Sequence, residues 1–223
     1  MNVKLFIEAI IKFVLGVILV GALLFISAGT INYFNGWLFM GLLFIPMFIA
    51  GIIMMIKSPE LLRRRLNAKE KEGEQQIVIK LSGLMFLIGF ILAGLNYRFK
   101  WLEMPNIVVI ISSIVFLCSY LVYAIILKEN AYLLRTIEVE DNQKLIDKGM
   151  YGIVRHPMYL MTIFLFLSMP LILGSLYSFL VFLVYPCIIV IRINNEEKIL
   201  DRDLKGYKEY KKKVKYRLIP FIW

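Results

Sequence analysis

The stretch MYLMTIFLFLSMPLILGSLYSFLVFLVYPCIIVI, residues 158–191, contains no charged side chain. Its 34 residues exceed the roughly 20 that one helix needs to cross a bilayer. Gly174 and Ser175 divide the stretch near its middle. The pattern therefore predicts two membrane helices joined as a tight hairpin, each arm near the lower length limit. Pro170 and Pro186 can kink the arms, because neighbouring helices satisfy the freed backbone groups.

Apolar residues also dominate the rest of the chain. Of its 223 residues 60% are hydrophobic, whereas soluble domains have about 45–50%, and the mean hydropathy is +0.76. A soluble fold is therefore excluded. Four more apolar runs, each long enough to span a bilayer, lie at about residues 5–28, 36–56, 77–95 and 107–127. We predict an all-α integral membrane protein with about six transmembrane helices, the last two forming the hairpin.

The first run, residues 5–28, has a second interpretation as a cleaved signal peptide, because Ser27 and Gly29 form a weak cleavage-like site. Nothing after it indicates an exported soluble domain, so we interpret it as a span. Glu8 and Lys12 lie four residues apart within it, on one helix face. We expect these two side chains to pair or to reach the lipid headgroups.

The positive charges predict the orientation of the chain. If the N-terminus is inside, the outer segments contain only Arg98 and Lys100, and the inner segments contain all the other Lys and Arg. Cytoplasmic loops of membrane proteins hold most of these residues, so we predict an even number of spans with both termini in the cytoplasm. The net charge of +10 indicates contact with a membrane surface and not with nucleic acid, since no basic stretch carries a recognition motif.

Cys118 and Cys187 are the two cysteines, and both lie within apolar runs. Their number and spacing support neither a disulfide framework nor a metal site, so we predict no metal. Unpaired cysteine packs as a small hydrophobic residue. We therefore expect both side chains to be buried in the core.

The segment from Glu196 is predicted to form a C-terminal cytoplasmic interfacial helix lying along an anionic membrane surface. Its lysines are interspersed with apolar residues near one face, namely Leu200, Leu204, Tyr207 and Val214. A solvated basic tail is the alternative interpretation.

Two polar clusters flank the hairpin, and polar groups at the membrane boundary are functional candidates. The first is GMYGIVRHPMY, residues 149–159, which places the only histidine, His156, at the mouth of the hairpin. The second is RINNEE, residues 192–197, at its exit. Because a hairpin returns the chain to its starting side, we expect the two clusters to face each other and to form one pocket.

The clusters and the tail together resemble the isoprenylcysteine carboxyl methyltransferases and their relatives among the phospholipid N-methyltransferases. The resemblance covers roughly residues 129–223 and rests on the order and spacing of several pieces. These are Gly149-x-Tyr151, Arg155-His156-Pro157-x-Tyr159, Arg192-x-x-x-Glu196-Glu197 with Leu200 after it, and Tyr207-x-x-Tyr210 through Pro220. The family often has glycine soon after the His-Pro-x-Tyr unit, whereas this chain has Leu160 and Met161.

The resemblance implies a membrane-embedded enzyme that binds S-adenosylmethionine on the cytoplasmic side of its last helices. The positions that match the family's cofactor site are Gln143, Lys144, Leu145, Ile146, Tyr151, His156, Pro157, Met158, Tyr159 and Glu196. Arg192 matches the position that the family uses toward the acceptor, and Arg192 and His156 are the predicted catalytic residues. We accordingly expect N-terminal transmembrane helices over residues 1–127 and a methyltransferase core over residues 128–223.

These residue types suit methyl transfer. S-adenosylmethionine carries an activated methyl group, so the protein mainly has to align donor and acceptor and to exclude water. An ionised carboxylate acceptor is already nucleophilic, and Arg192 can hold it by charge-assisted hydrogen bonds. We therefore expect a lipidic acceptor that enters from the bilayer, most simply a prenylcysteine-like carboxylate.

Three other functions stay open. N-methylation of an amino phospholipid needs a base, for which His156 and Glu197 are candidates. The membrane sterol and steroid reductases have an ending similar to the Tyr-Arg-Leu-Ile-Pro of residues 216–220. Their pattern resembles an Asn-Tyr unit followed by an acid at the positions where this chain has His-Pro-Met-Tyr, residues 156–159. A non-enzymatic membrane protein such as a transporter would have ionisable residues deep in several spans, which this chain almost lacks.

Each site residue also has a plain structural interpretation. Arg192 and Glu196 could form a simple interfacial ion pair, and His156 could cap the helix that follows it. Tyr151 and Tyr159 could belong to an interfacial aromatic belt. Their occurrence together, in this order, favours the functional interpretation.

Overall fold

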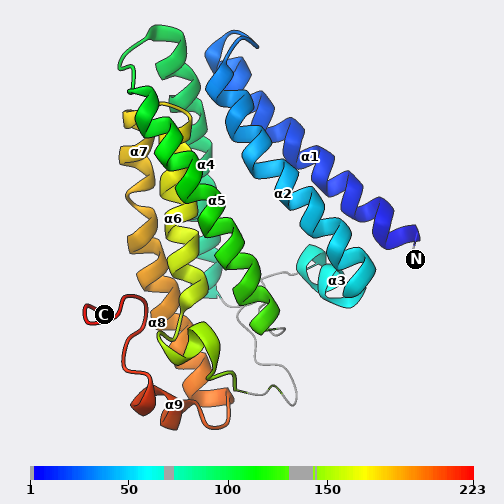
Figure 1. Cartoon of the computed structure of the whole chain (residues 1–223), viewed down its shortest axis with the longest axis vertical. Helices are drawn as coiled ribbons and strands as arrows, with labels where there is room; N and C mark the ends of the chain where they lie inside the picture. Colours follow the sequence, from blue (N-terminus) through cyan, green and yellow to red (C-terminus); the bar gives the residue numbers. More distant parts are fainter. Residues whose placement is uncertain (1–2, 68–72, 131–142, 144) are drawn as a thin grey trace.

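The computed structural model describes residues 3–67, 73–130, 143 and 145–223. Over these residues the chain forms helices and no strand, which confirms the predicted all-α class (Figure 1). The helices are α1 (Val3–Ala28), α2 (Phe34–Lys57), α3 (Pro59–Asn67), α4 (Gly73–Phe99), α5 (Asn106–Glu129), the 3-10 helix η1 (Gly149–Gly152), α6 (Pro157–Ile172), α7 (Leu176–Phe182), α8 (Tyr185–Asp203) and α9 (Tyr207–Lys213).

The long helices form a bundle with connections at both ends. α5 packs along α6, and α4 packs against α1, α7 and α8. In Figure 1 the α1–α2, α4–α5 and α6–α7 connections lie at the upper end, which we call the turn end. The N-terminus, α3 and α9 lie toward the lower end, which we call the site end. Both ends of the chain therefore lie away from the turn end in this view.

Within the described part of the chain, five segments are long and apolar enough to cross a membrane. They are α1, α2, residues 75–99 of α4, α5, and the α7–α8 segment, residues 176–203. The predicted hairpin is also present, with α6 as its first arm and only 16 residues long. Gly174 adopts a φ of 74° at the turn, and the Ser175 hydroxyl accepts a hydrogen bond from the Ser178 N–H at 3.2 Å to cap α7.

The expectation that both cysteines are buried is wrong, because Cys118 and Cys187 are exposed. Their helices present apolar side chains outward, including Leu121 on α5 and Val190 on α8. Lipid tails are as apolar as leucine, so a membrane helix can place apolar residues outside the protein core. An apolar run in this chain therefore predicts contact with lipid as readily as burial.

Glu8 and Lys12 form the predicted pair. The Lys12 Nζ lies 2.7 Å from Glu8 Oε1 and donates a second hydrogen bond, of 2.6 Å, to the Leu66 carbonyl. This lysine therefore connects α1 with α3 at the site end.

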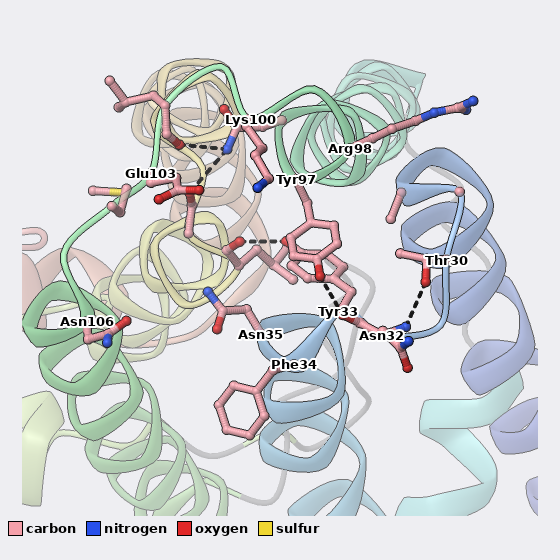
Figure 2. Close-up of a pocket in the computed structure, with 17 residues that line it drawn as sticks. Thr30, Asn32, Tyr33, Phe34, Asn35, Tyr97, Arg98, Lys100, Glu103 and Asn106 are labelled. Atoms are coloured by element: carbon pink, nitrogen blue, oxygen red, sulfur yellow. Dashed lines mark hydrogen bonds between the residues drawn. The ribbon is translucent and has the colours of Figure 1, made fainter.

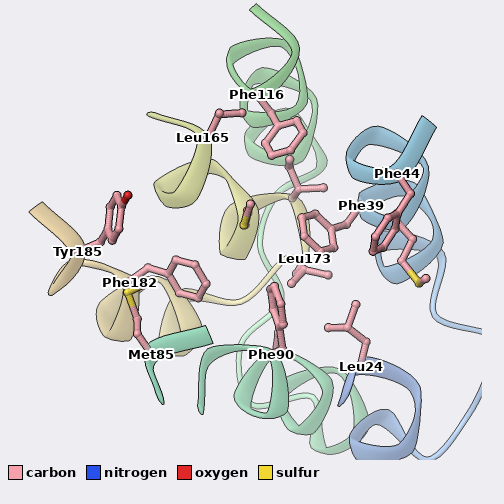
Figure 3. Packing of buried hydrophobic residues seen from close by; sticks show 14 of the residues in the cluster. Leu24, Phe39, Phe44, Met85, Phe90, Phe116, Leu165, Leu173, Phe182 and Tyr185 are labelled. Atoms are coloured by element: carbon pink, nitrogen blue, oxygen red, sulfur yellow. The ribbon is translucent and has the colours of Figure 1, made fainter. Parts of the chain in front are cut away.

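Aromatic rings from several helices meet in one core. Phe39 of α2, Phe116 of α5 and Phe182 of α7 have no exposed surface, and Phe90 of α4 is 4% exposed. Phe39 lies 5.5 Å from Phe90 and 6.3 Å from Phe116, measured between ring centroids. Figure 3 shows these rings pointing toward a common centre. Their packing ties the hairpin to the preceding helices and so positions the site-end residues of α6 and α8.

The C-terminal segment differs from its prediction. Glu196 lies inside α8, which continues to Asp203, and a new helix, α9, begins only after Gly206 with its φ of 87°. The apolar residues predicted to face the membrane form a second, smaller core instead. Its members are Leu204, Tyr207, Tyr210 and Val214, packed with Leu145 and Leu200.

Gly94 marks a close approach of α4 to α1. A Cβ atom here would lie 2.6 Å from the Leu24 carbonyl oxygen and 2.9 Å from the Ala28 nitrogen. We expect Gly94→Ala to lower the free energy of unfolding by about 1–3 kcal/mol, because the two backbones must separate. Gly83→Ala on the same helix is the control, since its Cβ would meet nothing within 4 Å. Thermal unfolding in detergent measures both, and equal effects would contradict the close packing.

Candidate active site

The candidate site lies at the site end, where α6 begins and α8 approaches its end. Pro157 starts α6, which suits a residue that has no N–H to satisfy. Residues 192–197 lie in the second half of α8. Arg155 Nε lies 2.7 Å from Glu197 Oε1 and so joins the first cluster to the second. The prediction that the two clusters face each other is confirmed.

Tyr159 connects the two predicted charged residues. Its Oη donates a hydrogen bond to Glu196 Oε2 at 2.5 Å and accepts one from Arg192 Nε at 2.8 Å. The Arg192 guanidinium also lies 5.7 Å from the centre of the Tyr159 ring. Tyr159 is buried, whereas Arg192 and Glu196 are half-buried. The buried Tyr159 hydroxyl therefore positions a half-buried cation, Arg192, and a half-buried anion, Glu196.

His156 is buried beside Tyr159. The two rings stack with their centroids 5.7 Å apart, and His156 Nε2 lies 3.3 Å from Glu197 Oε1. Because a carboxylate only accepts, the proton of the neutral imidazole belongs on Nε2, and Nδ1 is the acceptor. His156 occupies the N-cap position of α6 but makes no side-chain cap hydrogen bond. The interpretation of His156 as a plain helix cap is therefore wrong.

Glu197 is the centre of a buried charge network. It is 4% exposed, and its two oxygens contact guanidinium groups, Arg155 Nε at 2.7 Å and Arg217 Nε at 3.0 Å. The His156 ring shares Oε1 with Arg155. Two cations and an imidazole compensate the cost of burying this carboxylate. Glu197 is thus engaged by protein partners and is not placed to act as a general base.

The tail after α9 crosses the start of α6. The Arg155 N–H donates to the Tyr216 carbonyl at 3.0 Å, and the His156 N–H donates to the Arg217 carbonyl at 2.8 Å. Arg155 Nη1 donates to the Val214 carbonyl and to the next carbonyl along the chain, both at 2.8 Å. The tail therefore covers one side of the site, and it does so through its backbone carbonyl groups, which do not depend on the identity of the side chains.

Tyr151 lies in η1, and the Tyr210 hydroxyl donates to its carbonyl at 2.7 Å. Burial raises the pKa of the Tyr151 hydroxyl, the Asn130 side chain opposes this, and the nearby charge of Glu196 raises it further. Burial and the charge of Glu197 likewise raise the pKa of Tyr207. Both phenols consequently stay neutral at physiological pH, and the Tyr207 hydroxyl lies 3.5 Å from Glu197 Oε1.

The remaining predicted cofactor positions are distributed around this centre. Pro157 and Met158 form the first turn of α6, where Pro157 is fully buried and Met158 packs against the main core. Gln143, Leu145 and Ile146 are half-buried, and Lys144 lies outside the described residues. Leu145 belongs to the second core beside the tail. The role of these positions toward a cofactor stays a prediction.

Gly149 is required by the backbone of the site. It has a φ of 59°, and a Cβ atom would overlap the Glu129 carboxylate. Glu129 Oε2 accepts a hydrogen bond of 3.2 Å from the Met150 N–H and so ties the end of α5 to η1. Only glycine adopts this conformation without strain and leaves room for the carboxylate.

Sequence reasoning missed the pairing of Arg155 and Arg217 with Glu197. Arg155 entered only as part of the motif, and Arg217 entered only as part of the Tyr-Arg-Leu-Ile-Pro ending. The one available signal was the number of charges beside an apolar hairpin, because such charges need partners. The pairing itself depends on the turn at Gly206, which returns the tail to α6.

Two comparisons show similarity between this chain and known proteins. A stretch of 93 residues is 32% identical to Delta(14)-sterol reductase TM7SF2 of Mus musculus, and it covers 40% of this chain. That match spans 22% of the reductase, so the two chains share about a fifth of its length. Residues 107–206 match the family model described as phospholipid methyltransferase, and they run from α5 to the Gly206 turn. The segment that carries both clusters of the candidate site is therefore similar to membrane methyltransferases of the phospholipid methyltransferase type.

Proposed function

We propose that this protein transfers a methyl group from S-adenosylmethionine to a lipidic acceptor, and that the acceptor is a carboxylate of the prenylcysteine type. The observation that carries the proposal is the arrangement of Arg192, Tyr159 and Glu196. The buried Tyr159 hydroxyl is hydrogen-bonded to both of the half-buried charged side chains. The match of residues 107–206 to the phospholipid methyltransferase model supports the reaction class.

The residues present suit the cofactor. Glu196 uses Oε2 toward Tyr159, and its Oε1 has no hydrogen-bond partner among the described residues. A half-buried carboxylate oxygen of this kind can accept hydrogen bonds from an ammonium group or a ribose hydroxyl. Tyr151 and His156 add rings beside it, which can pack against the adenine or the sulfonium. When bound, S-adenosylmethionine supplies the methyl group on a positively charged sulfur.

Arg192 is suited to hold the acceptor. A guanidinium binds a carboxylate through two parallel hydrogen bonds, and the Nε contact with Tyr159 fixes its orientation. Methyl transfer from a sulfonium to a carboxylate removes both charges, so a site with few water molecules favours the transition state over the separated ions. The buried surroundings of Tyr159 supply that environment.

The engagement of Glu197 bears on the choice of acceptor. An amine must lose a proton before attack, and an amine N-methyltransferase therefore needs a base. Glu197 contacts Arg155, Arg217 and His156. Of the two base candidates, His156 and Glu197, this leaves only the Nδ1 atom of His156 with an acceptor position that Glu197 does not use. A carboxylate needs no base. Glu197 is therefore engaged elsewhere, and an amino phospholipid acceptor would depend on His156 Nδ1 as its base, whereas a carboxylate acceptor requires only a cation such as Arg192.

The partial match to the mouse sterol reductase supports a second candidate, a reductase that uses a nicotinamide cofactor. Residues 156–159 argue against a reductase. This chain has His-Pro-Met-Tyr there, whereas the sequence pattern of the reductases resembles an Asn-Tyr unit followed by an acid. The two candidates differ in the cofactor that they require, so one binding experiment separates them.

Calorimetry with the detergent-purified full chain tests the proposal. We expect the wild type to bind S-adenosylmethionine and its demethylated product. Glu196→Gln and Tyr159→Phe should each weaken the binding of S-adenosylmethionine about tenfold, because each variant loses one charge-assisted hydrogen bond. Glu209→Gln, an exposed acid on α9, is the control and should bind as the wild type does. Binding of NADPH without binding of S-adenosylmethionine by folded wild-type protein would overturn the proposal in favour of the reductase.

We also propose that the site end faces the cytoplasm. Arg192 contacts Tyr159 at this end and α9 with its basic residues also lies there, whereas Arg98 and Lys100 are the basic residues predicted outside. A cofactor made in the cytoplasm would then reach the site directly. Modification of introduced cysteines by an impermeant thiol reagent in intact cells tests this orientation.

A further inference from the structure

A pocket of about 630 Å³ (Figure 2) lies at the turn end, and none of the candidate active-site residues lines it. The α1–α2 turn, the α4–α5 loop and the α6–α7 turn surround it, together with the first residues of α2 and α5. Its volume lies within the roughly 300–1,000 Å³ that is usual for small-molecule sites. Neither the proposed methyl transfer nor the predicted site residues involve this pocket.

The walls of this pocket are held by hydrogen bonds and ring stacking. Tyr33 and Tyr97 stack with centroids 4.3 Å apart, and the Tyr33 hydroxyl donates to the Leu173 carbonyl at 2.5 Å. Tyr97 donates to the Asn32 carbonyl at 2.5 Å. Asn96, 5% exposed, uses its Nδ2 to join the α4–α5 loop and the α6–α7 turn. The pocket is therefore preformed, which lowers the entropy cost of binding a ligand.

Several polar groups that line the pocket lack protein partners. Within the described residues, Lys100 and Glu103 form no ion pair, and the side chains of Asn35 and Asn106 form no hydrogen bond. The Oδ1 of the buried Asn96 also has no hydrogen-bond partner there. Figure 2 shows Arg98 extending away from the other labelled side chains. Lys100 is thus the cation available to a ligand and Glu103 the anion.

The charges favour a ligand that carries both a phosphate and an amine. α2 and α5 begin at the pocket, and neither has a side-chain cap or an acidic residue in its first turn. The free N–H groups and partial positive charge of these helix starts add to Lys100 and favour a phosphate. Glu103, three residues along from Lys100, offers a counter-charge for an ammonium group.

Exposed aromatic residues place the pocket at the level of lipid headgroups. Trp37 and Trp101 are 53% and 45% exposed near it. Aromatic side chains gather at the membrane–water boundary, and the pocket lies where the apolar spans end. We propose that this pocket binds the zwitterionic headgroup of a phospholipid from the leaflet opposite the candidate active site, with the phosphate at Lys100 and the amine at Glu103.

Native mass spectrometry of the full chain, released from detergent with added phosphatidylethanolamine, tests the proposal. We expect retention of phosphatidylethanolamine, with at least fivefold less phosphatidylglycerol and diacylglycerol. Lys100→Gln and Glu103→Gln should each reduce retention about five- to tenfold, as the loss of one charged contact does. Lys57→Gln, which removes an exposed charge at the end of α2, is the matched control and should retain as much lipid as the wild type.

Asn106→Asp separates binding from folding. An acid in the first turn of α5 stabilises the helix but repels a phosphate, so we expect unchanged or higher thermal stability together with at least fivefold less bound lipid. Equal retention of phosphatidylglycerol, or no loss with Glu103→Gln, would overturn the zwitterionic assignment. Displacement by water-soluble glycerophosphoethanolamine at a concentration similar to that of the lipid would overturn the assignment to a membrane lipid.

Discussion

Glu197→Ala is expected to lower the free energy of unfolding by about 3–5 kcal/mol, because it leaves Arg155 and Arg217 without their shared carboxylate. The Arg155 side chain is only 8% exposed, so contact with solvent cannot fully compensate for the loss of that partner. We expect a lower thermal midpoint in detergent. Trypsin should also cut faster in the lysine-rich segment, residues 208–215, because the tail loses its anchor on the start of α6.

Two variants separate the network from a general loss of charge. Glu209→Ala removes an exposed acid from α9 and should change neither the thermal midpoint nor the rate of cleavage. Glu197→Gln keeps an acceptor oxygen and the side-chain volume but not the charge, so its loss of stability should lie between those of the alanine variant and the wild type. A Glu197→Ala protein as stable as the Glu209→Ala protein would show that the network contributes little.

Arg192→Leu is expected to lower kcat/KM for a prenylated cysteine acceptor by about 100-fold or more, equal to about 2.7 kcal/mol of transition-state stabilisation. The loss should be smaller for binding of S-adenosylmethionine, because the variant keeps the Tyr159 hydrogen bond to Glu196. Methyl transfer from a radiolabelled cofactor to the acceptor measures the first quantity, and calorimetry measures the second.

Arg192→Lys is the matched comparison, because it keeps the charge and loses the two-pronged geometry. We expect it to recover only part of the lost rate. The pH profile distinguishes the acceptor classes, since a carboxylate is ionised throughout the range of about pH 6–9, whereas an amine loses its proton as the pH rises. A flat profile agrees with a carboxylate. A rate that rises with pH, together with an unchanged rate for Arg192→Leu, would point to an amine acceptor.

Several parts of the site were predictable because they depend on local sequence. The break at Gly174 and Ser175 predicts the turn, and the turn brings residues 149–159 and 192–197 to the same end of the bundle. The length of the apolar run and the position of its break are enough to predict that the two clusters lie at the same end. The contact between Tyr159 and Glu196 then follows from their positions near the two ends of the hairpin.

The all-α membrane class, the helical segments and the ends of the hairpin follow from the amino-acid sequence alone, because each depends on a continuous run of apolar residues and its breaks. Tertiary structure alone decided which charges pair and where apolar side chains point. Arg217 reaches Glu197 only because Gly206 breaks the helix and returns the tail to α6. Cys118 faces outward and Leu204 packs inward, the reverse of what the sequence pattern predicted, because lipid and protein core are equally apolar surroundings.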